Sequence, residues 1–163
     1  MKSIATPRTE AATGAGHSDR ILLVEDDLAL ANLSAKVLTR SGFQVDLATD
    51  GLTGLSVLHR QAYDLVITDH RMPGITGVEM VSRLRHEHNE VPVVMASGAP
   101  ESKEMVRDPS LRISATLPKP FSLHQLVAVV RNVLAHRHPA PAAEVRCRSL
   151  SGMQGIQRWG LNE

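Results

Sequence analysis

The sequence predicts an α/β fold in three layers, built on a doubly wound, five-stranded parallel sheet. Five short apolar runs of strand length alternate with five segments whose apolar residues recur at helical spacing. Because two parallel strands need a crossover connection, usually a helix, this alternation favours a parallel sheet with helices on both faces. The length of 163 residues and the apolar content of 42% suit one domain with a proper core.

The folded domain is expected over residues 19–137. Residues 1–18 are rich in small residues and have no apolar periodicity, so they are read as a flexible N-terminal extension. Residues 138–163 have no clear core pattern and are read as a tail without a separate domain. Trp159, in the tail, is an apolar side chain that this reading does not explain.

The third predicted strand, residues 65–69, is the one around which the others are arranged. It is a continuous apolar run ending in Asp69, which indicates a strand buried on both faces. The turn after it contains Pro73 and Gly74, which favour such a break. The five predicted strands cover residues 21–24, 43–47, 65–69, 91–96 and 113–117.

The helices are predicted from apolar stripes and from residues that favour helix ends. Gly42 suits a C-terminal cap, and Asp50 and Ser122 suit N-terminal caps. Residues 100–107 could form a short helix that Pro109 would stop. In the other four helices, apolar residues recur at helical spacing, and those of the third helix, Val78, Val81 and Leu84, are expected to face inward. The residues of the other three apolar stripes are Leu30, Leu33, Val37, Leu52, Leu55, Leu58, Leu123, Leu126, Val127, Val130 and Leu134.

Four predicted strands are followed by chemically distinctive groups, namely Glu25–Asp26–Asp27, Asp69, Ser97 and Lys119. Since the carboxyl ends of parallel strands share one edge of the sheet, these groups are expected to lie there together. Taken singly, each has a simpler interpretation: Asp69 as a turn cap, Ser97 as a turn residue and Lys119 as a solvated lysine. Their joint placement after separate strands favours a site.

Glu25, Asp26 and Asp69 would form an acidic cluster at that edge. Two like charges about 4 Å apart cost on the order of 4 kcal/mol at an effective dielectric of about 20, so an ionised cluster needs a cation. Carboxylate ligands that also share phosphate favour Mg²⁺. An aspartate can accept a phosphoryl group as a nucleophile, and Mg²⁺, the Lys119 ammonium and the Ser97 hydroxyl would stabilise the negative charge of that group.

Four motifs within about residues 20–136 together resemble the receiver domain of two-component response regulators. They are Ile-Leu-Leu-Val-Glu-Asp-Asp, Thr-Asp-His-Arg-Met-Pro-Gly-Ile-Thr-Gly, Val-Met-Ala-Ser-Gly and Leu-Pro-Lys-Pro-Phe. The resemblance implies a flavodoxin-like sheet of strand order 2-1-3-4-5, whose switch point lies between the first and third strands.

The resemblance also implies a role for each residue at the matching positions. Asp69 would be the phosphoacceptor, Ser97 the switch hydroxyl, and Lys119 the partner of the phosphoryl oxygens. The Mg²⁺ ligands would be Glu25, Asp26, Asp69 and the backbone carbonyl of Arg71. The bond between Lys119 and Pro120 is a candidate cis peptide. Thr116 departs from the family, since many members carry Tyr or Phe there.

The function implied is a phosphorylation switch in two-component signal transduction rather than an enzyme. A histidine kinase or a histidine phosphotransfer protein would donate a phosphoryl group to Asp69, and the phosphorylated domain would act on a downstream effector protein. One alternative is a phosphatase with an aspartyl nucleophile, although Arg71 stands where such enzymes usually carry a second acid. Two others are a receiver fragment of a hybrid histidine kinase and a pseudo-receiver that only binds partners.

Charge and composition narrow the partners further. The net charge of +1 and the scattered basic residues argue against direct binding of nucleic acid. No apolar run approaches the roughly 18 residues of a membrane span, and no secretory signal is evident. The single cysteine, Cys147, suits a reducing compartment, so a cytoplasmic location is expected. His86, His88, His136 and His138 are expected to be exposed near helix ends, and His70 could tune access to Asp69.

Overall fold

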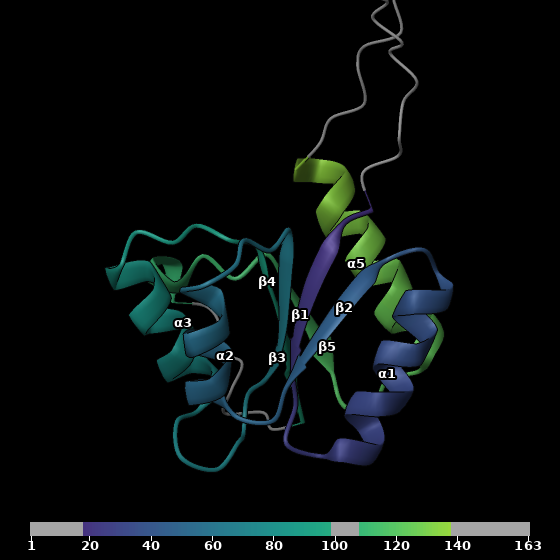
Figure 1. Cartoon of the computed structure of the whole chain (residues 1–163), viewed down its shortest axis with the longest axis horizontal. Helices are drawn as coiled ribbons and strands as arrows, with labels where there is room; N and C mark the ends of the chain where they lie inside the picture. The colour runs from purple at the N-terminus through teal and green to yellow at the C-terminus, as the bar shows by residue number, and fades with distance from the viewer. Residues whose placement is uncertain (1–17, 99–107, 138–163) are drawn as a thin grey trace, which may run out of the picture.

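The computed structural model describes residues 18–98 and 108–137. Its five strands form one parallel sheet of order β2-β1-β3-β4-β5, which confirms the predicted fold class and strand order (Figure 1). The strands are β1 (Arg20–Val24), β2 (Gln44–Ala48), β3 (Leu65–Asp69), β4 (Val93–Ser97) and β5 (Ala115–Pro118).

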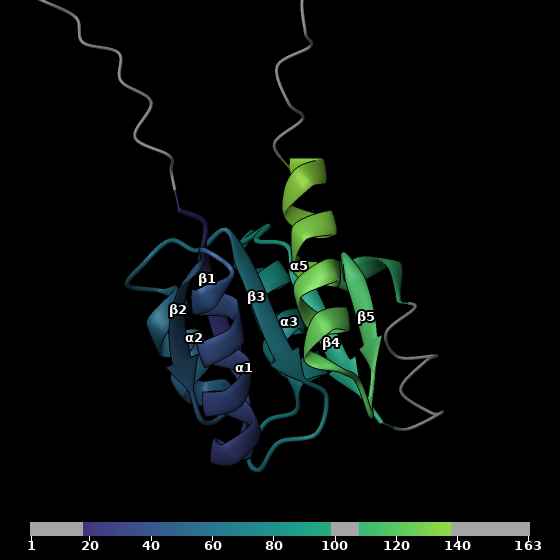
Figure 2. The ribbon, with the colours of Figure 1, turned by 90° about the vertical axis from the view of Figure 1, so that its right-hand side faces the viewer.

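Helices cover both faces of the sheet. They are α1 (Leu28–Arg40), α2 (Gly51–Leu58), α3 (Gly77–His86) and α5 (Leu123–Arg137), with a 3₁₀ helix η1 (Pro109–Leu111) before β5. In Figure 1, α2 and α3 lie on one side of the sheet and α1 and α5 on the other; Figure 2 shows the face that α1 and α5 cover. Each face has its own apolar core cluster, so the central strands are buried on both sides.

Side chains at the helix starts satisfy backbone N–H groups that have no partner within the helix. Asp50 accepts a hydrogen bond from the Thr53 N–H at 2.8 Å, and Ser122 accepts one from the Gln125 N–H at 3.2 Å, as predicted. Asp27 caps α1 in the same way. Thr76 and Glu79 form a reciprocal capping box at α3. At the end of α1, Gly42 has a φ of +99°, which favours glycine there.

Three leucines in the predicted helices and strands are exposed to solvent. Leu33 on α1 is 49% exposed and Leu52 on α2 is 55% exposed, while Leu47 on the edge strand β2 is 40% exposed. Leu33 and Leu52 thus lie on the predicted apolar stripes of α1 and α2 but are not buried. The side of α1 that faces the sheet instead carries Ala31, Ser34 and Leu38. Small side chains at two of these three positions let the helix approach the sheet closely, and the Leu33 stripe lies beside the contact.

The strands β4 and β5 begin later than predicted, at Val93 and Ala115 instead of residues 91 and 113. Pro92 has no N–H to donate to a neighbouring strand, so the ladder begins after it. Pro109 begins the 3₁₀ helix η1, whose first turn Asp108 caps. The helix predicted at residues 100–107 lies outside the described residues, as do residues 1–17 and 138–163.

Candidate functional site

The acidic residues reach one edge of the sheet because β1 and β3 are neighbours that end at the same level. Val24 pairs with Thr68 in the register, so Glu25 and Asp69 follow at matching positions. The chain then leaves β1 toward α1 and β3 toward α3, which lie on opposite faces. This is the switch point of a doubly wound sheet, where an open crevice forms.

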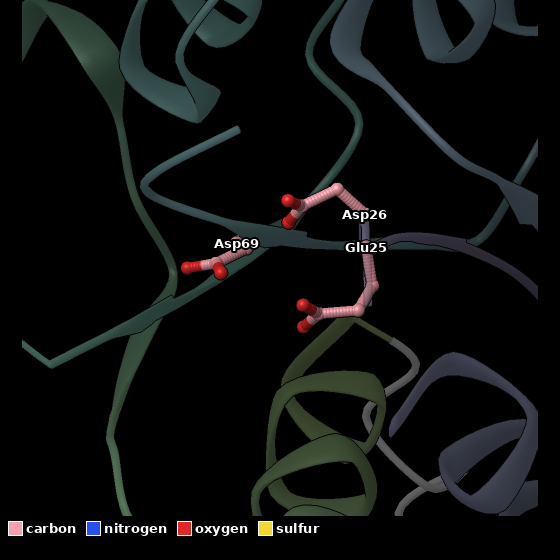
Figure 3. A group of neighbouring side chains, drawn as sticks. All are labelled: Glu25, Asp26 and Asp69. Atoms are coloured by element: carbon pink, nitrogen blue, oxygen red, sulfur yellow. The ribbon is translucent and has the colours of Figure 1, made fainter. Parts of the chain in front are cut away.

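The three carboxylates of Glu25, Asp26 and Asp69 gather at this switch point (Figure 3). Each offers one oxygen, and these oxygens lie within 4.8 Å of one another. Glu25 is buried, Asp69 is partly buried and Asp26 is exposed, so the cluster opens to solvent on one side. The predicted acidic cluster is therefore present in the structure.

Lys119, which follows β5, reaches into the same cluster. Its Nζ donates a hydrogen bond to Asp69 Oδ2 at 2.6 Å and another to Glu25 Oε2 at 3.1 Å. The Lys119 backbone N–H donates a hydrogen bond to the Ser97 carbonyl at 2.8 Å. The Lys119–Pro120 peptide is cis, as predicted. Lys119 thus connects the carboxyl ends of β4 and β5 to the acidic cluster.

Burial and charge shift the pKa values of this cluster. Burial raises the pKa of the Glu25 carboxyl above its usual value, against the opposing hydrogen bond and charge of Lys119. Burial alone would lower the pKa of the Lys119 ammonium, but its hydrogen bonds to Asp69 and Glu25 outweigh this and raise that pKa. The Glu25 carboxylate is therefore held in a site that stabilises it less than water does.

Replacing Glu25 with glutamine is expected to raise the melting temperature at neutral pH while weakening Mg²⁺ binding by at least about tenfold. A carboxyl whose folded pKa is raised costs stability progressively as the pH rises above its unfolded pKa of 4.5. The neutral amide removes that cost and keeps an oxygen acceptor for Lys119. Thermal unfolding at pH 4 and pH 7, with and without Mg²⁺, measures both effects. A variant less stable than wild type at pH 7 without Mg²⁺ would contradict this account.

The donor set fits Mg²⁺ by its chemistry. Three carboxylates on one solvent-open edge supply hard oxygen ligands and leave positions for water and phosphate. Among the described residues, Lys119 is the cationic side chain that bonds to two of these three carboxylates. One positive charge against three carboxylates leaves the cluster with a net negative charge. Glu25, Asp26 and Asp69 would hold the ion.

Two other residues expected at the site, Ser97 and Arg71, are close to Asp69 in the chain or in the sheet register. Ser97 is the last residue of β4, one position beyond Ala96, which pairs with Asp69. Arg71 lies in the turn after β3, where its N–H donates to Asp69 Oδ1 at 3.3 Å. Thr116 is exposed on β5, the edge strand. The roles predicted for Ser97 and for the Arg71 carbonyl stay predictions.

Two packing features near Asp69 were not predicted from the sequence: the close approach of Gly77 and the burial of His70. Gly77, at the start of α3, lies directly against the backbone of Asp69: an added Cβ would stand 2.1 Å from the Asp69 carbonyl oxygen. His70 is buried, and its Nδ1 has no hydrogen-bond partner in the structure. The histidines expected at helix ends are exposed where the structure describes them, at His86, His88 and His136.

The fold and the site together define a receiver-type module, with acidic residues and a lysine at the switch point of a five-stranded doubly wound sheet. Residues 21–131 match the model of the response regulator receiver domain family. The chain therefore belongs to this family, as its motifs indicated. It is a phosphoacceptor signalling module.

Similar proteins include the transcriptional regulatory protein TctD of Salmonella typhimurium, 37% identical over 115 residues that are 71% of this chain and 51% of TctD. The response regulator MprA of Mycobacterium leprae is 32% identical over 134 residues, 82% of this chain and 59% of MprA. The chain thus spans little more than half the length of these relatives.

Solved structures agree with the fold. The receiver domain of the Francisella response regulator 1452 superposes with a TM-score of 0.69 at 22% identity, covering 74% of this chain and all of that one. CheY4 of Vibrio cholerae gives a TM-score of 0.66 at 26% identity, over 72% of this chain and 99% of CheY4. Among the described helices, none is long and apolar enough to cross a membrane.

Proposed function

We propose that Asp69 accepts a phosphoryl group from a phosphohistidine on a histidine kinase or a histidine phosphotransfer protein. The observation that carries this proposal is the contact of the Lys119 ammonium with Asp69 within an acidic cluster suited to Mg²⁺. An Asp69 carboxylate oxygen bonds to phosphorus while the phosphorus–nitrogen bond of the donor breaks, and the imidazole leaves with the electron pair.

Each surrounding group has one task in this transfer. Lys119 stabilises the charge on the phosphoryl oxygens, and the Ser97 hydroxyl hydrogen-bonds the group once it is attached. Glu25, Asp26, Asp69 and the Arg71 carbonyl would hold Mg²⁺, which would neutralise negative charge on the phosphoryl oxygens. Water later hydrolyses the acyl phosphate and resets the switch. The phosphorylated state acts on a downstream effector protein; the name of TctD makes gene regulation the output to test first.

The proposal is tested with a phosphohistidine donor carrying labelled phosphate. Wild type should gain an acid-stable, base-labile label that depends on Mg²⁺ and disappears with a chelator. Asp69→Asn should gain none. Asp27→Asn is the matched control, because it changes a neighbouring carboxylate while asparagine still caps α1. Equal labelling of Asp69→Asn and wild type would show that another residue is the acceptor.

The protein donor is proposed to dock along α1, which begins beside the acidic cluster. Leu28 and Leu33 on this helix are 59% and 49% exposed, so apolar surface is available next to the site. Leu33→Asp is expected to slow transfer from the protein donor about tenfold and to leave phosphorylation by acetyl phosphate unchanged. Leu52→Asp, on the opposite face, is the control. Equal slowing with both donors would place the effect in the chemistry and not in docking.

A further inference from the structure

The loop between β3 and α3, residues 70–76, contacts the start of α2 at the same edge of the sheet as the acidic cluster (Figure 1). It begins directly after Asp69 and carries the Arg71 carbonyl, the proposed backbone ligand of Mg²⁺. The Arg71 N–H also donates to Asp69 Oδ1 at 3.3 Å, so a shift of the loop would reach the acidic cluster directly. What holds this loop therefore also sets the geometry of the metal site.

Three described contacts hold the loop in place. The Met72 side chain is buried in the apolar cluster beneath α2 and α3. At the end of the loop, the Gly77 N–H donates to the His70 carbonyl at 3.0 Å. Between these two points, the partly buried side chain of Ile75 packs against the same apolar cluster. The path of the loop thus depends on how closely Ile75 can approach α2.

The approach of Ile75 uses space that a side chain at Gly51, the first residue of α2, would fill. A Cβ there would stand 2.6 Å from Ile75 Cγ1, 3.0 Å from its Cδ1 and 3.2 Å from its carbonyl oxygen. Since the carbonyl is also close, a side chain would displace the backbone of the loop as well as the isoleucine. The φ angle of Gly51 lies outside the left-handed region, so the space and not the backbone conformation requires glycine.

We propose that Gly51 and Ile75 are positioning residues for the metal site. The missing side chain at Gly51 admits Ile75, and Ile75 fixes the loop that carries the Arg71 carbonyl. This inference rests on the proposed function, because it takes that carbonyl as a ligand of Mg²⁺. It makes the affinity for Mg²⁺ depend on α2, a helix that supplies none of the proposed ligands.

The test measures Mg²⁺ binding to the full chain by calorimetry. Gly51→Ala should weaken binding about tenfold or more. Ile75→Ala should weaken it by less, because that change loosens the loop without displacing it. The double variant should bind Mg²⁺ more tightly than Gly51→Ala, because the clashing side-chain atoms are absent. Raising the Mg²⁺ concentration should restore the rate at which acetyl phosphate phosphorylates Gly51→Ala, as a change in metal affinity requires.

Gly54→Ala, on the same helix, is the matched control. A Cβ at Gly54 would stand 3.1 Å from Met80 Sδ and 3.1 Å from Val24 Cγ2, so this variant crowds α2 without touching the loop. It should bind Mg²⁺ as wild type does. Circular dichroism and urea unfolding without Mg²⁺ show which variants are folded and how stable they are.

Wild-type affinity in folded Gly51→Ala would overturn the inference. Equal losses in Gly51→Ala and Gly54→Ala would also overturn it, because they would assign the effect to a general loosening of α2. If Gly51→Ala does not fold, the double variant decides: it should bind as Ile75→Ala does, and weaker binding would overturn the inference. None of these results changes the labelling of Asp69 in wild type, so the proposed function is tested separately. A wild type that bound no Mg²⁺ would overturn both.

Discussion

Replacing Gly77 with alanine is expected to destabilise the domain by about 3 kcal/mol or more. A Cβ at this position would stand 2.1 Å from the Asp69 carbonyl oxygen and 3.0 Å from Thr68 Oγ1. Neither neighbour can move easily: Thr68 is fully buried, and the Gly77 N–H is bonded to the His70 carbonyl at 3.0 Å. In an unobstructed helix the same change would stabilise by roughly 0.5–1 kcal/mol, so the packing against β3 reverses the sign.

Urea unfolding followed by circular dichroism measures this effect. Gly98→Ala is the matched control, because a Cβ at Gly98 would meet Lys119 Cβ at an ordinary 3.6 Å. Its stability should stay within about 0.5 kcal/mol of wild type. Since the clash pushes on the residue that ends β3, Gly77→Ala should also lose phosphorylation on Asp69. A variant as stable as wild type would mean that α3 and the end of β3 separate at little cost.

The fold could be predicted because each central strand is a short apolar run that ends in a polar group. The side of each helix that faces the sheet could not be predicted as well. Periodicity shows that α1 has an apolar stripe through Leu33, but it does not show where the sheet lies relative to that stripe. The contact with the sheet uses Ala31 and Ser34, whose small size matters only once the two elements are packed.

The acidic cluster could be predicted because residues at strand ends share an edge whatever the details of packing. Gly77 could not, since its requirement comes from a contact between α3 and β3. The burial of His70 likewise depends on how the elements pack and could not be predicted from the sequence. The Thr76 cap is different: the sequence Thr-x-x-Glu before the apolar residues of α3 is a recognisable capping box and would have predicted the start of this helix.

Replacing Lys119 with methionine is expected to slow phosphorylation of Asp69 by about 100-fold or more, while Mg²⁺ binds more tightly than in wild type. The slower transfer follows from the loss of a cation beside the phosphoryl oxygens. The tighter binding follows because the ammonium, 2.6 Å from Asp69 and 3.1 Å from Glu25, competes with a divalent cation for these carboxylates. Few substitutions would move the two quantities in opposite directions, so the pair identifies the role of Lys119.

Rates with acetyl phosphate and Mg²⁺ titrations monitored by calorimetry give the two measurements, with Lys36→Met, at an exposed lysine on α1, as the control.

The difference in folding stability between wild type and Lys119→Met provides a third measurement. Because the pKa of Lys119 is raised above 10.5, its stabilising contribution is complete below pH 10.5 and is lost as the pH rises through the folded pKa. The difference in stability between wild type and Lys119→Met should therefore be constant near neutrality and shrink only at strongly alkaline pH. If Mg²⁺ affinity instead fell together with the rate, Lys119 would be organising the carboxylates as ligands, and the transfer rate would depend on it only indirectly.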